Sequence, residues 1–263
     1  MRIRSFKMER MKPMNKKEWM NQSKSAHNLC MFFCLLLMIL PVSLQAQAPN
    51  GVVGEVSLLA AEWKDYWECR EDAWIIDQEG TLTCQMEEVL QKNGKKRVRG
   101  MGYLWTRDEF SDFVLDVEYR LSPQANSGIF FRADPEDPVQ DGFEIQLLDD
   151  SGILQAGGKL NAKKLNAALY DCQSPSMDVA NPAGEWNELR LTCRGSFINV
   201  ELNQKIVNQI DLRRWTDSKR NPDGTANKFE RPLSKRRSAG RIGFQNHGKQ
   251  VWFRNVRVTP LNL

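Results

Sequence analysis

The chain has 263 residues, a formal net charge of +4 at pH 7 and a hydrophobic content of 41%. Its basic excess lies in residues 1–48, which hold 8 Lys or Arg and 2 Asp or Glu, so the remainder carries a net charge of −2. Nucleic acid and anionic membrane are therefore not expected as partners of the remainder, because both attract basic surfaces. Two short basic runs, 92–99 and 235–237, each adjoin a turn signal and are expected to be solvated loops.

Residues 1–48 have the organisation of a secretory signal peptide. A basic start precedes the apolar run 29–42, and small residues lead to Ala46 and Ala48, either of which can be the cleavage point. The run is shorter than the roughly 20 apolar residues of a membrane-spanning helix, so an uncleaved anchor is the weaker alternative. The true start is open among several methionines: Met1, Met8, Met11 and Met14. We expect the remaining chain in the periplasm or secreted, with no membrane association after cleavage.

The remainder, residues 55–262, is expected to form one all-β domain. No Pro/Ser-rich linker or fixed-period repeat divides it, and no segment keeps a helical period over three turns. Strand-like runs separated by turn signals occur, in chain order, at 74–76, 81–83, 103–105, 112–121, 128–132, 143–148, 186–194, 197–202, 205–211, 241–245 and 251–259. Residues 213–238 are charged and aperiodic, which indicates a long loop. Many short strands in a single domain favour a β-sandwich or jelly roll.

The stretch 126–149 carries the most informative alternation. Ile129 and Phe131 are expected to point into the core, and Phe130 and Arg132 to the opposite face. In 143–148, Glu144 and Gln146 likewise alternate with apolar residues. Arg, Glu and Gln offer hydrogen-bond donors and acceptors that suit a polyhydroxylated ligand. The alternative interpretation is an ordinary outer face with long polar side chains.

Two further residues are candidates for chemistry. His247 is the single histidine after the leader, and it shares a strand face with Gln245 if the strand continues to that point. A histidine can act as base, acid or metal ligand, or it can be an ordinary loop residue. Tyr170 follows a small-residue turn in the sequence NAALY, and it can be a platform for a sugar ring or an aromatic at the edge of the core.

The sequence contains only weak patterns for a metal or cofactor site. His247 with Glu144 or Asp149 can hold a divalent cation, but these residues lack a diagnostic metal spacing, and no cofactor is expected. Four cysteines follow the leader, Cys69, Cys84, Cys172 and Cys193, and none has zinc-site or redox spacing. They allow three disulfide pairings after export, and isolated buried thiols are equally expected.

Several motifs in a fixed order resemble the 3-keto-disaccharide hydrolase family: WIIDQEGTL, DFVLDVEYR, NSGIFFR, GFEIQLLD, NAALYD, GEWNELRL and GRIGFQNHG. The resemblance spans residues 58–258. It implies an antiparallel two-sheet jelly-roll sandwich, concanavalin A-like and glucanase-like, whose concave face binds carbohydrate. On that map Arg132, Glu144, Gln146, Gln245 and His247 fall on or near the concave face. Three features depart from the family pattern: Gln204 replaces a glycine in a turn, a TGALY-like stretch reads NAALY, and Asn246 replaces the aspartate that precedes the histidine.

The activity that the resemblance implies is cleavage of 3-keto-glucosides or 3-keto-disaccharides by elimination and hydration. The expected base is His247, with Glu144 as the alternative, and Arg132 is the expected stabiliser of the enolate. Substrate contacts are expected from four residues: Gln146, Gln245, Tyr170 and Asp149.

Two other functions remain open from the sequence. One is a lectin-like module that binds glycans on the same face without catalysis. The other is a retaining β-glucanase, in which a strand bulge brings two acids to one face about 5–5.5 Å apart. The corresponding residues here are Glu144, Gln146 and Asp149, so the middle acid is an amide and the last acid is one methylene shorter.

Overall fold

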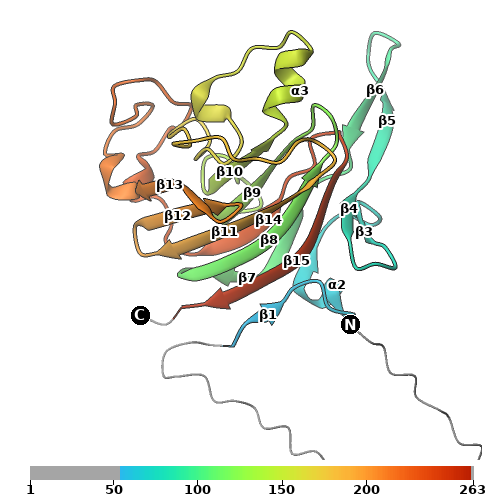
Figure 1. The fold of residues 1–263 in the computed structure, drawn as a ribbon, viewed down its shortest axis with the longest axis horizontal. Helices are drawn as coiled ribbons and strands as arrows, with labels where there is room; N and C mark the ends of the chain where they lie inside the picture. The colour runs from blue at the N-terminus through green and yellow to red at the C-terminus, as the bar shows by residue number, and fades with distance from the viewer. Residues whose placement is uncertain (1–53, 262–263) are drawn as a thin grey trace, which may run out of the picture. The chain divides into compact units, whose positions relative to one another are not determined.

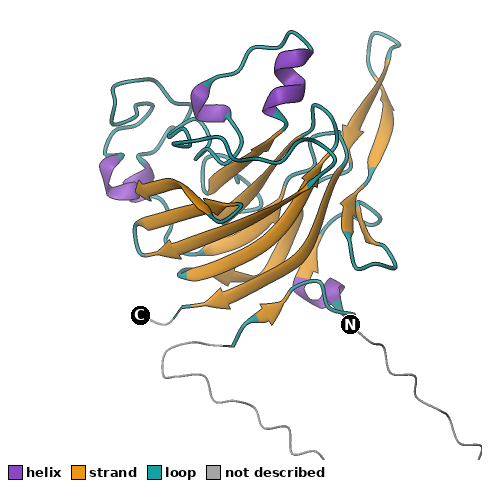
Figure 2. Cartoon of the chain, in the orientation of Figure 1, coloured by secondary structure: helices purple, strands orange, loops and turns teal. Residues whose placement is uncertain are grey.

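A computed structural model describes residues 54–261, and the predicted signal peptide lies outside these described residues. Two antiparallel sheets form the domain (Figures 1 and 2). The eight-stranded sheet has the order β13 (Lys205–Asp211), β12 (Phe197–Leu202), β11 (Trp186–Arg194), β8 (Phe113–Leu121), β15 (Val251–Pro260), β4 (Leu82–Cys84) and β3 (Trp74–Ile76), with β1 (Val56–Ser57) beside β15. The five-stranded sheet has the order β10 (Phe143–Leu148), β9 (Asn126–Ala133), β14 (Gly240–Phe244), β7 (Leu104–Phe110) and β2 (Trp67–Glu68).

Helical structure is short in the described part of the chain. It comprises the helices α2 (Trp63–Tyr66) and α3 (Asp150–Gln155) and the 3-10 turns η1 (Ala162–Lys164), η2 (Leu212–Arg214) and η3 (Leu233–Lys235). Within residues 54–261, no helix is long and apolar enough to cross a bilayer. The predicted antiparallel two-sheet fold is confirmed, and five of the predicted strands match at both ends, those that became β3, β10, β11, β12 and β13.

The core lies between the sheets and is rich in aromatic side chains. Phe244 of the five-stranded sheet stacks on Phe253 of the eight-stranded sheet with 4.2 Å between ring centroids, and Trp67 packs on Phe244 at 5.1 Å. The alternation predicted for β8 is also observed, because every second residue from Phe113 to Leu121 is buried. Offset aromatic contacts of this kind add to the stabilisation from burial.

Two predicted loops have more structure than expected. Residues Lys96–Gly100 form strand β6, which pairs with β5 (Met86–Leu90) as a separate two-stranded hairpin that projects from the sandwich (Figure 1). Gly94 takes φ 80° in its turn, and the basic side chains stay exposed. In 213–238, Trp215, Phe229 and Leu233 are buried, so this segment packs against the domain.

The four described cysteines are free thiols: Cys69, Cys84, Cys172 and Cys193. Burial raises the pKa of Cys84 to about 11 and that of Cys172 to about 12, which keeps both thiols protonated and unreactive at neutral pH. The alternative of isolated buried thiols therefore describes Cys84, Cys172 and Cys193, whereas Cys69 is partly exposed.

The predicted orientation of Arg132 is wrong because of a β-bulge. The β9–β14 register shifts beside Arg132, which takes φ 47°, and Ala133 instead packs with Phe130. The guanidinium of Arg132 donates to the carbonyl oxygens of Ser111 and Gly195, both at 2.7 Å, and to Oδ1 of Asp112 at 3.0 Å. These contacts use all three nitrogens of the buried guanidinium, so Arg132 connects the two sheets and does not bind a ligand.

We predict that Arg132→Met destabilises the fold, because it leaves the buried Asp112 carboxylate without its cation. Loss of one partner of a buried pair costs roughly 3–5 kcal/mol in free energy of unfolding. Urea unfolding followed by tryptophan fluorescence measures this difference. Arg190→Met is the control, because Arg190 forms an exposed pair with Asp116 whose loss costs about 1 kcal/mol or less. Equal stability of Arg132→Met and the unsubstituted protein would contradict this role.

Candidate active site

The strand register places a row of side chains across one face of the five-stranded sheet. Glu144 pairs with Phe130, Phe130 pairs with Gly243, and Gly243 pairs with Trp105. Directly paired residues present their side chains on the same face. Phe130 and Trp105 pack together with 5.5 Å between ring centroids, so Glu144 lies at one end of an aromatic row.

The neighbouring row on the same face is polar. Gln146 pairs with Gly128, and the carbonyl oxygen of Gly128 accepts a hydrogen bond from the backbone N–H of Gln245 at 2.9 Å. Tyr103 comes just before β7, and its ring stacks on Phe130 with 5.6 Å between centroids. Oε1 of Gln146 is buried and has no hydrogen-bond partner among the described residues. A buried acceptor without a partner is suited to a donor from a ligand.

Two glycines make space for this arrangement. A Cβ atom on Gly128 would lie 2.4 Å from Oε1 of Glu144, and a Cβ on Gly243 would lie 2.3 Å from the ring of Trp105. Both distances are far below a van der Waals contact, so a side chain at either position would displace Glu144 or Trp105. The sheet therefore accommodates both groups by omitting the side chain beside each.

The carboxyl group of Glu144 is nearly buried, and Glu144 is 9% exposed. Burial raises its pKa to about 7, while the charge of Lys228 and a hydrogen bond from Gln245 oppose the rise. Nε2 of Gln245 donates that bond to Oε1 at 3.2 Å. Burial, and then the charge of Glu144, also raise the pKa of Tyr103, against a hydrogen bond with Gln245. Gln245 thus links Glu144 and Tyr103, and within this group Glu144 is the residue that can take up or release a proton near neutral pH.

A short extended segment borders the site beyond β10. Leu169 forms a bridge with Ile145, and the backbone N–H of Tyr170 donates to the carbonyl oxygen of Glu144 at 2.9 Å. This register puts Tyr170 beside Glu144. The Nζ atom of Lys228 lies 4.1 Å from the centroid of the Tyr170 ring, within the range of a cation–π contact.

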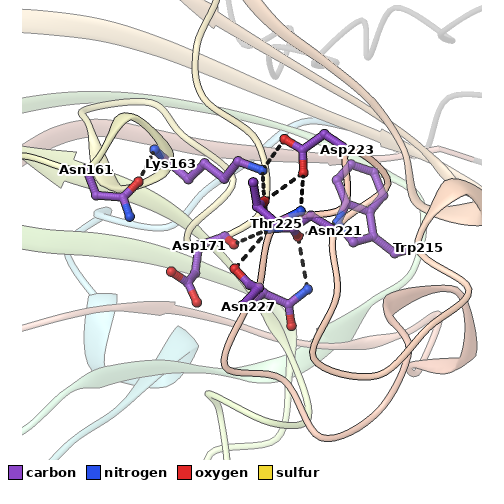
Figure 3. Close-up of polar contacts among 9 residues, drawn as sticks. Asn161, Lys163, Asp171, Trp215, Asn221, Asp223, Thr225 and Asn227 are labelled. Atoms are coloured by element: carbon purple, nitrogen blue, oxygen red, sulfur yellow. Dashed lines mark hydrogen bonds and ion pairs between the residues drawn. The ribbon is translucent and has the colours of Figure 1, made fainter.

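A polar network holds the loop that carries Lys228 (Figure 3). Nδ2 of Asn221 donates to the carbonyl oxygen of Asp171 at 3.1 Å, and Oδ1 of Asn221 accepts from Trp215 and Asn227, both at 2.9 Å. On the other side of the network, Nζ of Lys163 donates to Oδ2 of Asp223 at 2.5 Å and to Oγ1 of Thr225 at 2.7 Å. The loop is therefore fixed by buried hydrogen bonds rather than free in solvent.

The structure brings together four of the seven site residues predicted from the sequence: Glu144, Gln146, Gln245 and Tyr170. Arg132 is elsewhere, for the reason given above. Strand β14 ends at Phe244, and His247 is exposed in the turn that follows. Buried Asn246 holds this turn by donating to the carbonyl oxygen of Gln85 at 2.6 Å. The expected strand continuation, which would have placed His247 beside Gln245, does not occur.

Asp149 also has another role. Strand β10 pairs with β9 without a bulge, so Asp149 does not share the face of Glu144. Its Oδ1 caps helix α3 by accepting from the N–H of Gly152 at 3.0 Å, and its Oδ2 accepts from the N–H of Gln124 at 2.6 Å. The acid pair required by the retaining β-glucanase alternative is thus missing at these positions. Among residues 54–261, no three His, Cys, Asp or Glu side chains converge as metal ligands.

A second carboxyl with a raised pKa, that of the partly exposed Asp150, competes as a site. Burial raises the pKa of Asp150 to about 6, and Asp150 lines a cavity of about 220 Å³. Its Oδ2 already accepts from the N–H of Asn166 at 3.0 Å. The residues around this cavity include no aromatic ring and no cation. The Glu144 face has both and is the better candidate.

Sequence reasoning missed Tyr103, Trp105 and Lys228. Tyr103 and Trp105 are two residues apart in a predicted strand, and this spacing of aromatic residues was an available signal for a shared face. Lys228 lies in an aperiodic segment, where no pattern indicates its approach to Glu144.

The fold and the site define an antiparallel sandwich with a buried carboxyl on one sheet face. A family model described as the 3-keto-alpha-glucoside-1,2-lyase-like domain matches residues 56–259. The chain belongs to this family, and the resemblance predicted from its motifs is confirmed.

Similar proteins come from Bacteroides thetaiotaomicron and Parabacteroides distasonis. A 3-keto-disaccharide hydrolase of Bacteroides thetaiotaomicron is 29% identical over 174 residues, which cover 59% of this chain and 60% of the relative. A crystal structure of a candidate glycosyl hydrolase from Parabacteroides distasonis matches with TM-score 0.68 and 27% identity, covering 80% of this chain and 100% of the other. Another structure from the same organism matches with TM-score 0.60 and 19% identity, covering 80% and 94%, and shows the fold alone.

We predict that the ionisation of Glu144 destabilises the folded state. Its pKa of about 7 exceeds its ordinary 4.5, so the folded state binds the proton more tightly. Free energy of unfolding then falls between pH 4.5 and 7, by on the order of 3 kcal/mol. Glu144→Gln lacks this loss, so its stability relative to the unsubstituted protein should rise over that interval.

Urea unfolding at pH 4.5 and pH 8 measures the effect. Glu79→Gln, which removes an exposed carboxyl, is the matched control. A stability difference between Glu144→Gln and the unsubstituted protein that is the same at both pH values would contradict the burial argument.

Proposed function

We propose that the protein is a carbohydrate-active enzyme that cleaves the glycosidic bond of 3-keto-glucosides by elimination followed by hydration. The observation that carries the proposal is the nearly buried carboxyl of Glu144, with a pKa of about 7, at the end of an aromatic row. Family membership and the name of the Bacteroides relative support the substrate class. The chain spans about 60% of that relative's length, so the relative's activity enters only as part of this proposal.

The chemistry starts with a ketone at C3 of the sugar, which makes the hydrogen on C2 acidic. A base removes this proton, the C1–oxygen bond breaks, and water adds to the resulting unsaturated ketone. Glu144 is the proposed base, because a catalytic base works best when its pKa lies near the working pH. This reverses the order expected from the sequence, since His247 is exposed in a turn outside the polar row.

The other groups of the site suit an oxygen-rich substrate. Tyr103 is kept protonated by its raised pKa and can donate a proton to the leaving oxygen. Gln245 orients the carboxyl of Glu144, and the free Oε1 of Gln146 can accept from a sugar hydroxyl. The partly exposed rings of Tyr103 and Tyr170 offer apolar surface to a sugar ring. Export to the periplasm or medium stays part of the proposal.

A non-catalytic lectin-like module is the second candidate, because stacking rings and amides also suit binding alone. A buried carboxyl that can ionise is costly to keep in a protein that only binds, and this favours the enzyme. Product detection with an oxidised and an unmodified disaccharide separates the two functions. Binding of both sugars without turnover of either would support the module.

We predict that Glu144→Gln lowers kcat/KM on a 3-keto-glucoside by roughly 10²–10⁴-fold, the usual contribution of a positioned base. His247→Ala should retain most of the activity.

The kcat/KM of the unsubstituted protein should rise through about pH 7, because the base must be ionised. In deuterated water, addition of a proton at C2 should leave deuterium there.

Full activity of Glu144→Gln, or a product without label at C2, would contradict the mechanism. Loss of activity in His247→Ala with normal activity in Glu144→Gln would return the base assignment to His247.

A further inference from the structure

The elimination proposed above builds negative charge on the ketone oxygen, and Arg132 is not available to stabilise it. All three nitrogens of the Arg132 guanidinium donate to Ser111, Asp112 and Gly195 in the interior. An enolate without a cation or strong donor beside it forms slowly, so the site requires another such group.

We propose that Lys228 is a catalytic residue whose ammonium group binds the ketone oxygen and stabilises the enolate. This inference rests on the proposed function. The Nζ atom of Lys228 lies 4.1 Å from the Tyr170 ring, and Tyr170 is hydrogen-bonded through its backbone to Glu144. The base and the cation therefore border the same position on the sheet face, as proton removal from C2 and charge at the C3 oxygen require.

The ammonium of Lys228 is free to bind a ligand. Among the described residues it forms no ion pair within 4.0 Å, whereas Lys163, Lys164 and Lys219 each pair with a carboxylate. Lys228 as a whole residue is exposed, so a substrate can reach it. Partial burial of its ammonium lowers its pKa, and the charges of Glu144 and Asp171 oppose this change. The group is thus accessible, partly desolvated and not neutralised by a close partner.

The backbone around Lys228 is fixed although the segment is irregular. Its N–H donates to Oδ2 of Asp171 at 2.9 Å, and its two neighbours, Asn227 and Phe229, are buried. Asn227 is bonded to Asn221, the centre of the network in Figure 3. A cation on a fixed backbone needs little reorganisation when charge develops, which is the condition for electrostatic catalysis.

Lys164 is the rival cation. Its Nζ lies 5.3 Å from the same Tyr170 ring, but it pairs with Oδ1 of Asp171 at 3.3 Å. That carboxylate offsets its charge and orients it toward the loop. Lys228 makes only a backbone contact to Asp171, so its charge stays available.

The electron movements balance in two steps. Glu144 takes the proton from C2, and that bonding pair forms a C2–C3 double bond while the ketone pair moves to oxygen beside Lys228. The pair on the enolate oxygen then forms the C3 ketone again, and the C2–C3 double-bond pair moves to form a C1–C2 double bond. The C1–oxygen bond breaks, and its electron pair leaves with the oxygen. The leaving oxygen takes a proton from an acid, for which Tyr103 is placed. Lys228 remains an ammonium throughout and forms no covalent bond.

The test compares Lys228→Met, Lys228→Arg and Lys219→Met on a 3-keto-glucoside. We expect Lys228→Met to lower kcat by roughly 10²–10³-fold with a small change in KM, since the contact strengthens as charge develops. Lys228→Arg should recover part of kcat because it restores the charge. Lys219→Met is the matched control from the same loop, where Lys219 pairs with exposed Glu230, and it should keep normal rates.

Exchange of the C2 hydrogen with deuterated solvent supplies a second readout, which a structural role would not change selectively. It should slow in Lys228→Met as much as kcat does, while circular dichroism and the melting temperature stay close to those of the control. Normal kcat in Lys228→Met, or loss only in Lys164→Met, would overturn the assignment. A borohydride-trapped adduct on Lys228 would also overturn it, because it requires an imine. If the unsubstituted protein does not turn over the substrate, the proposed function itself fails.

Discussion

The carboxyl group of Glu144 fits beneath its neighbours because the adjacent strand has no side chain at Gly128, where a Cβ would lie 2.4 Å from Oε1. Burial without a close ion pair raises the pKa to about 7, and Gln245 supplies a single side-chain donor. The remaining properties of the site follow from this constraint. The group can change its protonation state near neutral pH, and its charge helps keep Tyr103 protonated.

The strands of the two sheets could be predicted from the sequence. Alternation with a period of two predicted β8 and β10, and turn signals between strand-like runs set the limits of β11 to β13. Alternation assumes an uninterrupted strand, and it failed where the strand is interrupted. The bulge at Arg132 turned that side chain from the ligand face into the interior, where it joins Asp112. The end of β14 at Phe244 left His247 in solvent for a similar reason.

The positions of the loops were harder to predict from the sequence, since they depend on contacts between distant segments. Lys228 is 84 residues from Glu144, and hydrogen bonds of Asn221 and Asp171 help to bring its backbone beside Tyr170. The charged, aperiodic composition of 213–238 indicated only a long loop, yet its asparagines and Trp215 form a buried network (Figure 3). Asp149 was predicted as a site residue because it occupies the last acid position of the glucanase pattern, and its local role as the cap of α3 was not recognised. Motif order carried the family identification where these local signals did not.

The central claim is that the fold holds one carboxyl group poised near neutrality on a carbohydrate-facing sheet. Its most direct test is the titration of the glutamate side-chain carboxyls by carbon-13 NMR, with Glu144→Gln used to assign the signal. The account predicts one glutamate with a midpoint near pH 7 that disappears in the variant. A Glu144 signal that titrates near its ordinary value of 4.5 would contradict it.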